Sequence, residues 1–104
     1  MSMHLIQILL PLYNNDKEPF PGSFFTPLRE ELASKFGGVT AYSSAPATGL
    51  WKENDDKTVK DKIIVYEVMT DELDRQWWLL FRKRIELVLQ QEEVVIRAIP
   101  IQRL

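Results

Sequence analysis

The segment IIVYEV at residues 63–68 is apolar except for Glu67 and is rich in β-branched and aromatic residues, which favour strands over helices. Two further apolar runs are similar to it, LIQILLPL at residues 5–12 and VVIRAIPI at residues 94–101. Each has the length of a buried strand rather than of a helix. Pro100 cannot donate to a neighbouring strand, so it places the last run at an edge or at a strand end. We therefore expect a β-sheet built around residues 63–68.

The segment after the first run has the spacing of an amphipathic helix. Ser23 is suited to cap its N-terminus, and Gly37 can take the left-handed conformation that ends a helix. The apolar positions recur every three or four residues, at Phe25, Leu28, Leu32 and Phe36.

A second amphipathic segment follows the central strand. Thr70 or Asp71 is expected to cap it. With about 100° of rotation per residue, Trp77 is expected to point to the core, and Trp78 is expected to lie at the edge of the apolar stripe of this helix. The stripe consists of Leu73, Trp77, Leu80, Phe81, Ile85, Val88 and Leu89.

Two strands are expected between these helices. Residues 39–44 predict a strand, which APATG at residues 45–49 interrupts as a bulge or bend before residues 50–52 resume it. A hairpin turn at residues 54–57 leads into the strand at residues 58–69. The order β-α-β-β-α-β, with two right-handed crossovers, gives a four-stranded antiparallel sheet with both helices on one face. This is the ferredoxin-like α+β fold, and residues 1–104 form one such domain.

The composition excludes several kinds of site and partner. The chain has no cysteine and one histidine, His4, so thiolate metal sites, disulfides and a Cys nucleophile are excluded. We expect no metal and no cofactor. The net charge of −2 argues against nucleic-acid and anionic-membrane partners, which bind basic surfaces. The apolar N-terminal run is too short to span a membrane and has no basic leader region, so we expect a cytoplasmic protein.

The strands predict a sheet that is apolar on both faces. Alternate residues of a strand point to opposite faces, and one face suits the two helices. The other face is also mostly apolar, although no helix remains to cover it. We expect a second copy to cover it, as in dimeric α/β barrels; the alternative is a monomer whose long hairpin folds over this face. The residues of this face are Leu5, Gln7, Leu9, Ile63, Val65, Glu67, Met69, Val95, Arg97, Ile99 and Ile101.

Three polar residues interrupt the uncovered face: Gln7, Glu67 and Arg97. In this strand order the first strand lies between the third and the fourth, so Gln7 can sit between the other two. A carboxylate and a guanidinium inside an apolar interface should be paired. The group forms either the floor of a ligand pocket, with Tyr42 and Trp51 as walls, or a structural pair that fixes the register between subunits.

Three short motifs resemble a family of small, uncharacterised bacterial proteins. They are FGGVT at residues 36–40, Gly49 with Trp51, and DKIIVYEVM at residues 61–69. They match the patterns F-G-G-[VL]-T, G-x-W and D-x-[IV]-[VI]-x-[FY]-E-V-M. The resemblance implies a ferredoxin-like fold and a bacterial cytoplasmic protein, and it implies no catalytic residue.

Two functions remain open. The first is a homodimeric module that binds a small ligand or a partner. The second is a cofactor-free enzyme of the dimeric α/β-barrel type that acts on a small organic substrate, with Glu67 or Tyr42 as acid or base and Arg97 orienting an anionic group. A concave, water-excluding cavity in which Glu67 or Arg97 is reachable would favour the enzyme, whereas a pair sealed between strands or subunits would favour a structural role. RNA recognition is not expected, because aliphatic Ile63 and Val65 stand where stacking aromatic rings would be needed.

Overall fold

The computed structural model describes residues 3–54 and 57–104, with side chains described outside residues 43–47, 49 and 51–61. The elements are β1 (Met3–Pro11), the short 3-10 helix η1 (Gly22–Phe24), α1 (Thr26–Phe36), β2 (Thr40–Asn54), β3 (Lys57–Thr70), α2 (Arg75–Val88) and β4 (Val95–Ile101). The predicted order of strands and helices is confirmed. The turn predicted at residues 54–57 falls on residues 55 and 56, which lie outside the described residues.

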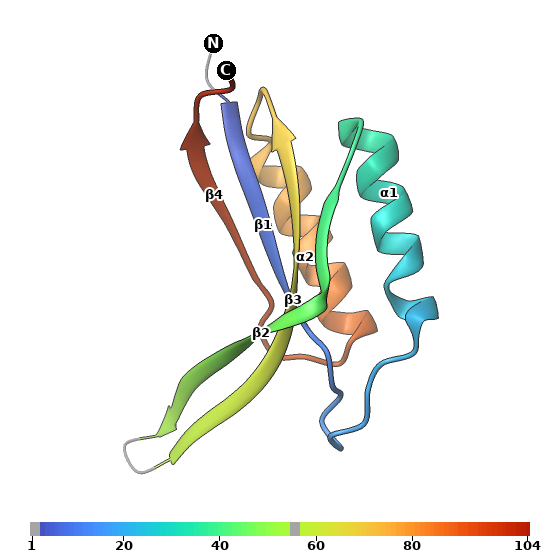
Figure 1. The fold of residues 1–104 in the computed structure, drawn as a ribbon, viewed down its shortest axis with the longest axis vertical. Coiled ribbons are helices and arrows are strands. Elements are labelled where there is room, and N and C mark those ends of the chain that lie inside the picture. Colours follow the sequence, from blue (N-terminus) through green and yellow to red (C-terminus); the bar gives the residue numbers. More distant parts are fainter. Residues whose placement is uncertain (1–2, 55–56) are drawn as a thin grey trace.

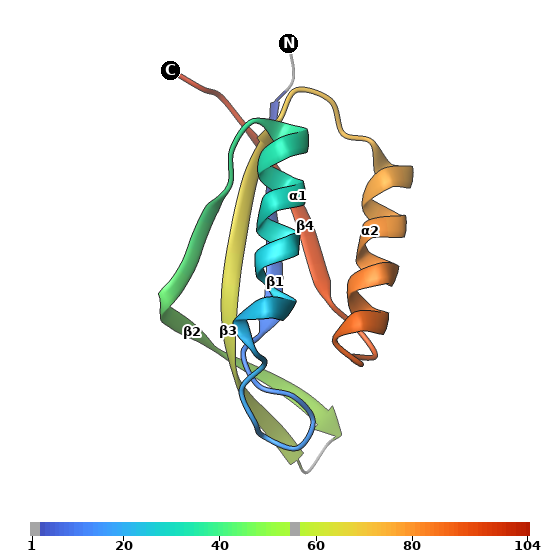
Figure 2. The same cartoon turned by 90° about the vertical axis from the view of Figure 1, so that its right-hand side faces the viewer.

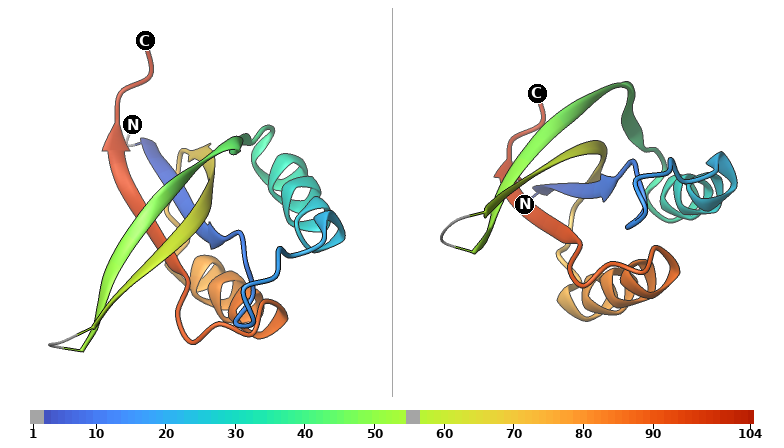
Figure 3. Two further views of the ribbon diagram at one scale, coloured as in Figure 1. Left: turned by 60° about the horizontal axis from the view of Figure 1, so that its bottom comes forward. Right: turned by 90° about the horizontal axis from the view of Figure 1, so that it is seen from below.

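The four strands form one antiparallel sheet in the order β2-β3-β1-β4. Both helices lie on the same side of this sheet (Figure 1, Figure 2), so the fold is ferredoxin-like, as predicted. Figure 3 shows α1 toward the β2 side of the helix layer and α2 toward the β4 side. In the part of the chain that the structure describes, no helix is long and apolar enough to cross a membrane.

The core lies between the helices and the even-numbered residues of β1 and β3. Ile8 pairs with Tyr66 on β3 and with Ile96 on β4. Tyr66 is fully buried, and its hydroxyl accepts a hydrogen bond of 3.2 Å from Arg29 Nη1 on α1. The other core residues from these strands are Ile6, Leu10, Ile64 and Val68. The opposite face of the sheet carries no helix.

The strands β2 and β3 continue past the rest of the sheet as a projecting hairpin (Figure 1). Their register is regular as far as Tyr42 opposite Val65, and the next pair is Ala47 opposite Ile63. β2 therefore contains extra residues between Tyr42 and Ala47. A bulge or bend was predicted at residues 45–49; the irregularity begins earlier, and pairing is regular again from Ala47 to Gly49.

Both predicted helix starts are wrong. Ser23 lies in η1, and α1 begins three residues later, with the Thr26 hydroxyl donating to the Gly22 carbonyl at 3.1 Å. At α2 the cap is Asp74, whose carboxylate accepts from the Trp77 backbone N–H at 3.0 Å. Several residues before α2 have side chains that can accept a hydrogen bond from a free backbone N–H of the first turn. The path of the preceding loop determines which of them reaches that N–H group and caps the helix. The predicted end of α1 is correct, because Gly37 caps it with φ of 80°.

The buried face of α2 is turned about the helix axis relative to the predicted one. Trp78 is 7% exposed and belongs to the core, whereas Trp77 is only partly buried. The predicted roles of the two rings are thus exchanged. The core positions are Trp78, Phe81, Ile85 and Leu89, and the predicted stripe members Leu80 and Val88 are exposed.

Candidate functional site

A row of polar side chains crosses the face of the sheet that has no helix. Thr40 on β2 lies opposite Glu67, Glu67 lies opposite Gln7, and Gln7 lies opposite Arg97. Gln7 Nε2 donates to Glu67 Oε2 at 2.8 Å, and Gln7 Oε1 accepts from Arg97 Nε at 2.6 Å. One amide therefore bridges a carboxylate and a guanidinium, using its donor for one and its acceptor for the other.

Apolar side chains flank this row on both sides. The register places Leu5 between Met69 and Ile99, and it places Leu9 between Val65 and Val95. Met69 is 45% exposed, Val95 42% and Ile99 40%. The projecting hairpin thus does not cover these three side chains. We refer below to this surface as the open face; it consists of Leu5, Gln7, Leu9, Val65, Glu67, Met69, Val95, Arg97, Ile99 and Ile101 with Thr40 and Tyr42. Ile63, which was expected on this face, is buried.

Tyr42 joins the row from β2. Its neighbour across the ladder is Val65, so it stands next to Glu67 on the same face. The hydrogen bond to the Glu67 carboxylate, then the negative charge of that carboxylate, and lastly burial raise the pKa of the Tyr42 phenol above its usual 10.0. The phenol is therefore held in its protonated form as a hydrogen-bond donor.

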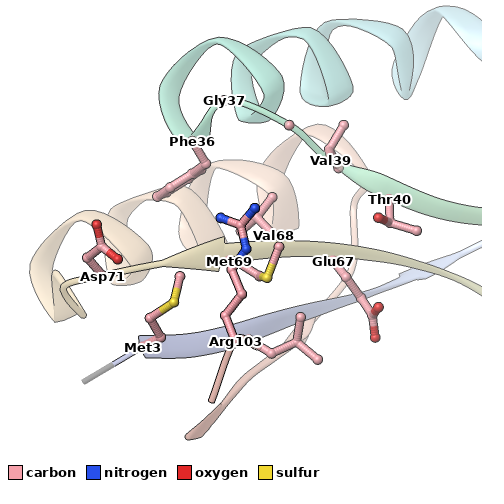
Figure 4. A pocket seen from close by; sticks show the side chains of 12 residues that line it. Met3, Phe36, Gly37, Val39, Thr40, Glu67, Val68, Met69, Asp71 and Arg103 are labelled. Atoms are coloured by element: carbon pink, nitrogen blue, oxygen red, sulfur yellow. The ribbon is translucent and has the colours of Figure 1, made fainter. Parts of the chain in front are cut away.

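A cavity of about 670 Å³ opens at one end of the open face, where α1 turns into β2. Its walls come from the turn at Gly37, from the start of β1 and from the end of β3 (Figure 4). The left-handed backbone at Gly37 lets the chain reverse tightly there, because a glycine takes this conformation without steric cost. The volume lies in the range of small-molecule sites, which is roughly 300–1,000 Å³.

The cavity combines apolar walls with charges of both signs. Met3, Leu5 and Met69 supply sulfur and aliphatic surface. Glu67 and Asp71 supply carboxylates at the end of β3, and Arg103 supplies a guanidinium from the segment after β4. Figure 4 shows the Arg103 guanidinium between the Met69 side chain and the turn that holds Gly37. A small organic molecule with an apolar body and polar groups fits this lining.

The structure brings four of the five predicted site residues together. Gln7, Glu67 and Arg97 are hydrogen-bonded in one row, and Tyr42 contacts Glu67. Trp51 lies on β2 opposite Val59, beyond the register shift, and its side chain is outside the described residues. Of the four whose side chains are described, Glu67 is the one that also lines the cavity.

The cavity uses several residues that the sequence did not single out as site residues. Arg103 follows the last strand, and Asp71 was expected to cap a helix. Met3 and Gly38 complete the walls. The FGGVT motif was the available signal, since its glycines and Thr40 form the turn at the cavity mouth.

His4 lies within β1 rather than before it, and its Nδ1 is buried without a hydrogen-bond partner in the described residues. The described side chains include no cluster of three His, Asp or Glu residues able to hold a metal ion.

Comparisons with known proteins support the fold. No family model matches the sequence, and no curated protein matches it. Among solved structures, the divalent cation tolerance protein CutA1 from Thermus thermophilus superposes with a TM-score of 0.63 at 14% identity, covering 97% of this chain and 85% of that one. A phage SAM lyase in complex with S-methyl-5'-thioadenosine superposes with a TM-score of 0.62 at 12% identity, covering 97% of this chain and 90% of that one. At these identities the likeness establishes the shared α+β fold.

Proposed function

We propose that this protein is a homodimeric small-molecule-binding module, in which two copies meet through the open face and enclose the ligand at its cavity end. The observation that carries the proposal is the position of Glu67. This residue belongs to the polar row at the centre of the open face, and it also lines the cavity. A partner that covers the row would therefore also cover one wall of the cavity.

The open face has the character of an interface. Its exposed apolar side chains are contiguous with the half-buried Leu5, Leu9 and Val65. Such patches on soluble proteins commonly mark interaction sites. Gln7 and Glu67 have hydrogen-bond partners within the subunit, so a second copy could cover the polar row without leaving either of them unpaired. A symmetric dimer is the commonest way in which one surface covers itself.

Self-association is tested by placing a charge on the open face. Ile99→Lys should convert a dimer into a monomer in sedimentation velocity or in light scattering after size exclusion. Leu87→Lys is the matched control, because Leu87 on α2 is 80% exposed and faces away from the sheet. A wild-type protein that is monomeric at high micromolar concentration, or an Ile99→Lys protein that remains dimeric, would contradict the proposal.

Ligand binding is tested by calorimetry. S-methyl-5'-thioadenosine is a suitable first probe, because the phage SAM lyase that shares the fold binds it and because its thioether and hydroxyls suit a cavity with Met3, Leu5 and two carboxylates. We expect binding by the wild type and weaker binding by Asp71→Asn and Arg103→Gln. A panel of other small metabolites in thermal-shift assays extends the test. If no compound binds, the proposal of ligand binding is wrong. The proposal of a homodimer is tested separately, by the Ile99→Lys variant.

A second candidate function is a cofactor-free enzyme. The observation that favours it is the contact between the Tyr42 phenol and Glu67, which places a proton donor beside a possible base at the cavity wall. Arg97 would orient an anionic group of the substrate. The test is incubation with S-adenosylmethionine and measurement of released S-methyl-5'-thioadenosine. Activity that is lost in both Glu67→Gln and Tyr42→Phe would support the enzyme, and absence of product would leave the binding module.

A further inference from the structure

We infer that the groove between α2 and β4 is a second binding site, which takes a small apolar organic anion, a carboxylate or a phosphate ester. This groove lies on the helix side of the sheet, away from the open face, and it does not depend on the function proposed above. Its volume is about 330 Å³. Figure 3 shows the helix and the strand that form its two sides.

The first argument is the spacing of the residues on α2. Arg75, Trp78, Leu79 and Arg82 line the groove. Trp78, Leu79 and Arg82 follow Arg75 by three, four and seven positions, so the four residues form one face of the helix. The face has a guanidinium at each end and apolar surface between them. This pattern suits a ligand with an anionic end and an apolar body.

The second argument is the state of Arg82. Its Nε atom is buried and has no hydrogen-bond partner in the described part of the chain. A buried donor without an acceptor is costly, and native proteins rarely leave one unpaired. The planar guanidinium is well suited to carboxylate or phosphate oxygens, which it can bind in a bidentate manner. An anion in the groove would supply the missing acceptor once the groups that cover Nε move aside.

The third argument is the floor of the groove. Ala98 on β4 points to the helix side, where it pairs with Ile6, and yet it is exposed. Its short side chain leaves the space open between Trp78, which is in the core, and Leu79, which is 39% exposed. Arg97 borders the groove from β4, but its Nε is bonded to Gln7 on the other face. On the helix side of the groove the positive charge comes from Arg75 and Arg82.

The test uses a matched set of ligands followed by NMR. Naphthalene-2-carboxylate and 2-naphthyl phosphate carry the anion in its two forms, and naphthalene-2-carboxamide is the neutral counterpart. In ¹H–¹⁵N spectra we expect the anions to shift the Arg82 Nε–H signal and the Trp78 indole signal, with dissociation constants of about a millimolar. The carboxamide should bind about tenfold more weakly or not at all. The stronger of the two anions identifies the preferred headgroup.

Three variants of the whole chain complete the test. Arg82→Gln should weaken binding of the anions about tenfold, and Ala98→Phe should abolish binding by filling the groove. Lys83→Gln is the matched control, since it removes one positive charge from an exposed neighbouring position on α2. The inference is overturned if neither anion shifts the Arg82 signal, if acid and amide bind equally, or if Arg82→Gln behaves like Lys83→Gln. Comparison of acid with amide on the wild type keeps the test decisive if a variant does not fold.

Discussion

Gln7 Nε2 donates to Glu67 Oε2 across 2.8 Å, from β1 to its neighbour β3, at the centre of the open face. The same amide accepts from Arg97 on the other side. The carboxylate and the guanidinium are thus linked through a neutral side chain. This arrangement satisfies both charged groups on a surface that is otherwise apolar, and it fixes the orientation of the Gln7 amide.

Replacing Gln7 by leucine tests the role of this bridge. Gln7→Leu removes both hydrogen bonds and leaves Glu67 and Arg97 without their partner. In a free subunit these groups remain partly hydrated, so we expect the free energy of unfolding to fall by less than about 1 kcal/mol. Dimer formation would instead bury Glu67 and Arg97 without the amide that links them, so we expect the dimer dissociation constant to rise about tenfold or more.

The measurement for this variant is sedimentation equilibrium together with chemical unfolding. Gln76→Leu is the control, because Gln76 is an exposed glutamine on α2. Equal self-association of the two variants would mean that the polar row lies outside the dimer interface.

The titration of Tyr42 gives a prediction about pH. Since Glu67 raises the pKa of the Tyr42 phenol above 10.0, the folded state favours the protonated phenol. The stability that this contact contributes is therefore present below pH 10 and is lost as the pH rises through the higher folded-state pKa. Glu67→Gln removes the negative charge and should lower the Tyr42 pKa toward 10.0.

Tyrosinate absorbance near 295 nm measures this titration. The titration curve of the Tyr42→Phe protein is subtracted from that of the wild type, which removes the contributions of Tyr13 and Tyr66. A Tyr42 pKa at or below 10.0 in the wild type would show that the phenol does not contact Glu67 in solution.

The sheet could be predicted closely from the sequence because strand geometry leaves few choices. Once residues 5–12, 63–68 and 94–101 are strands, alternation assigns each residue to a face. The strand order then brings Gln7 between Glu67 and Arg97, as the register confirms. A slip of one residue would have placed all three among the core side chains.

The helix starts could not be predicted in this way. Thr70, Asp71 and Asp74 can all cap a helix, and the choice depends on the path of the loop rather than on residue type. The rotation of α2 about its axis could not be predicted either, because adjacent Trp77 and Trp78 both lie on or beside the apolar stripe, and packing against the sheet selects Trp78 for the core.

The cavity was missed for a different reason. Arg103 is far along the chain from Asp71 and Met69, and only the antiparallel pairing of β4 with β1 returns the C-terminal segment to the end of β3.

The cap of α2 provides a direct comparison of two aspartates. Asp74→Ala removes the acceptor of the Trp77 N–H and should lower the free energy of unfolding by about 1 kcal/mol. Asp71→Ala, at the position that the sequence favoured, should change it by less than about 0.5 kcal/mol. Urea unfolding measures both values. Equal losses would mean that the cap in solution is shared between the two residues or lies elsewhere.

The hydrogen bond between Tyr66 and Arg29 connects the buried centre of the sheet to α1. Tyr66→Phe keeps the ring in the core and removes the hydroxyl, which leaves Arg29 Nη1 without its acceptor at 3.2 Å. We expect a loss of about 0.5–1.5 kcal/mol in the free energy of unfolding. Arg29→Met and the double variant Tyr66→Phe/Arg29→Met complete a double-mutant cycle. The coupling energy from this cycle separates the contribution of the hydrogen bond from the general loss of packing. A coupling energy near zero would show that the hydrogen bond does not contribute, and that Tyr66 stabilises the fold through its ring alone.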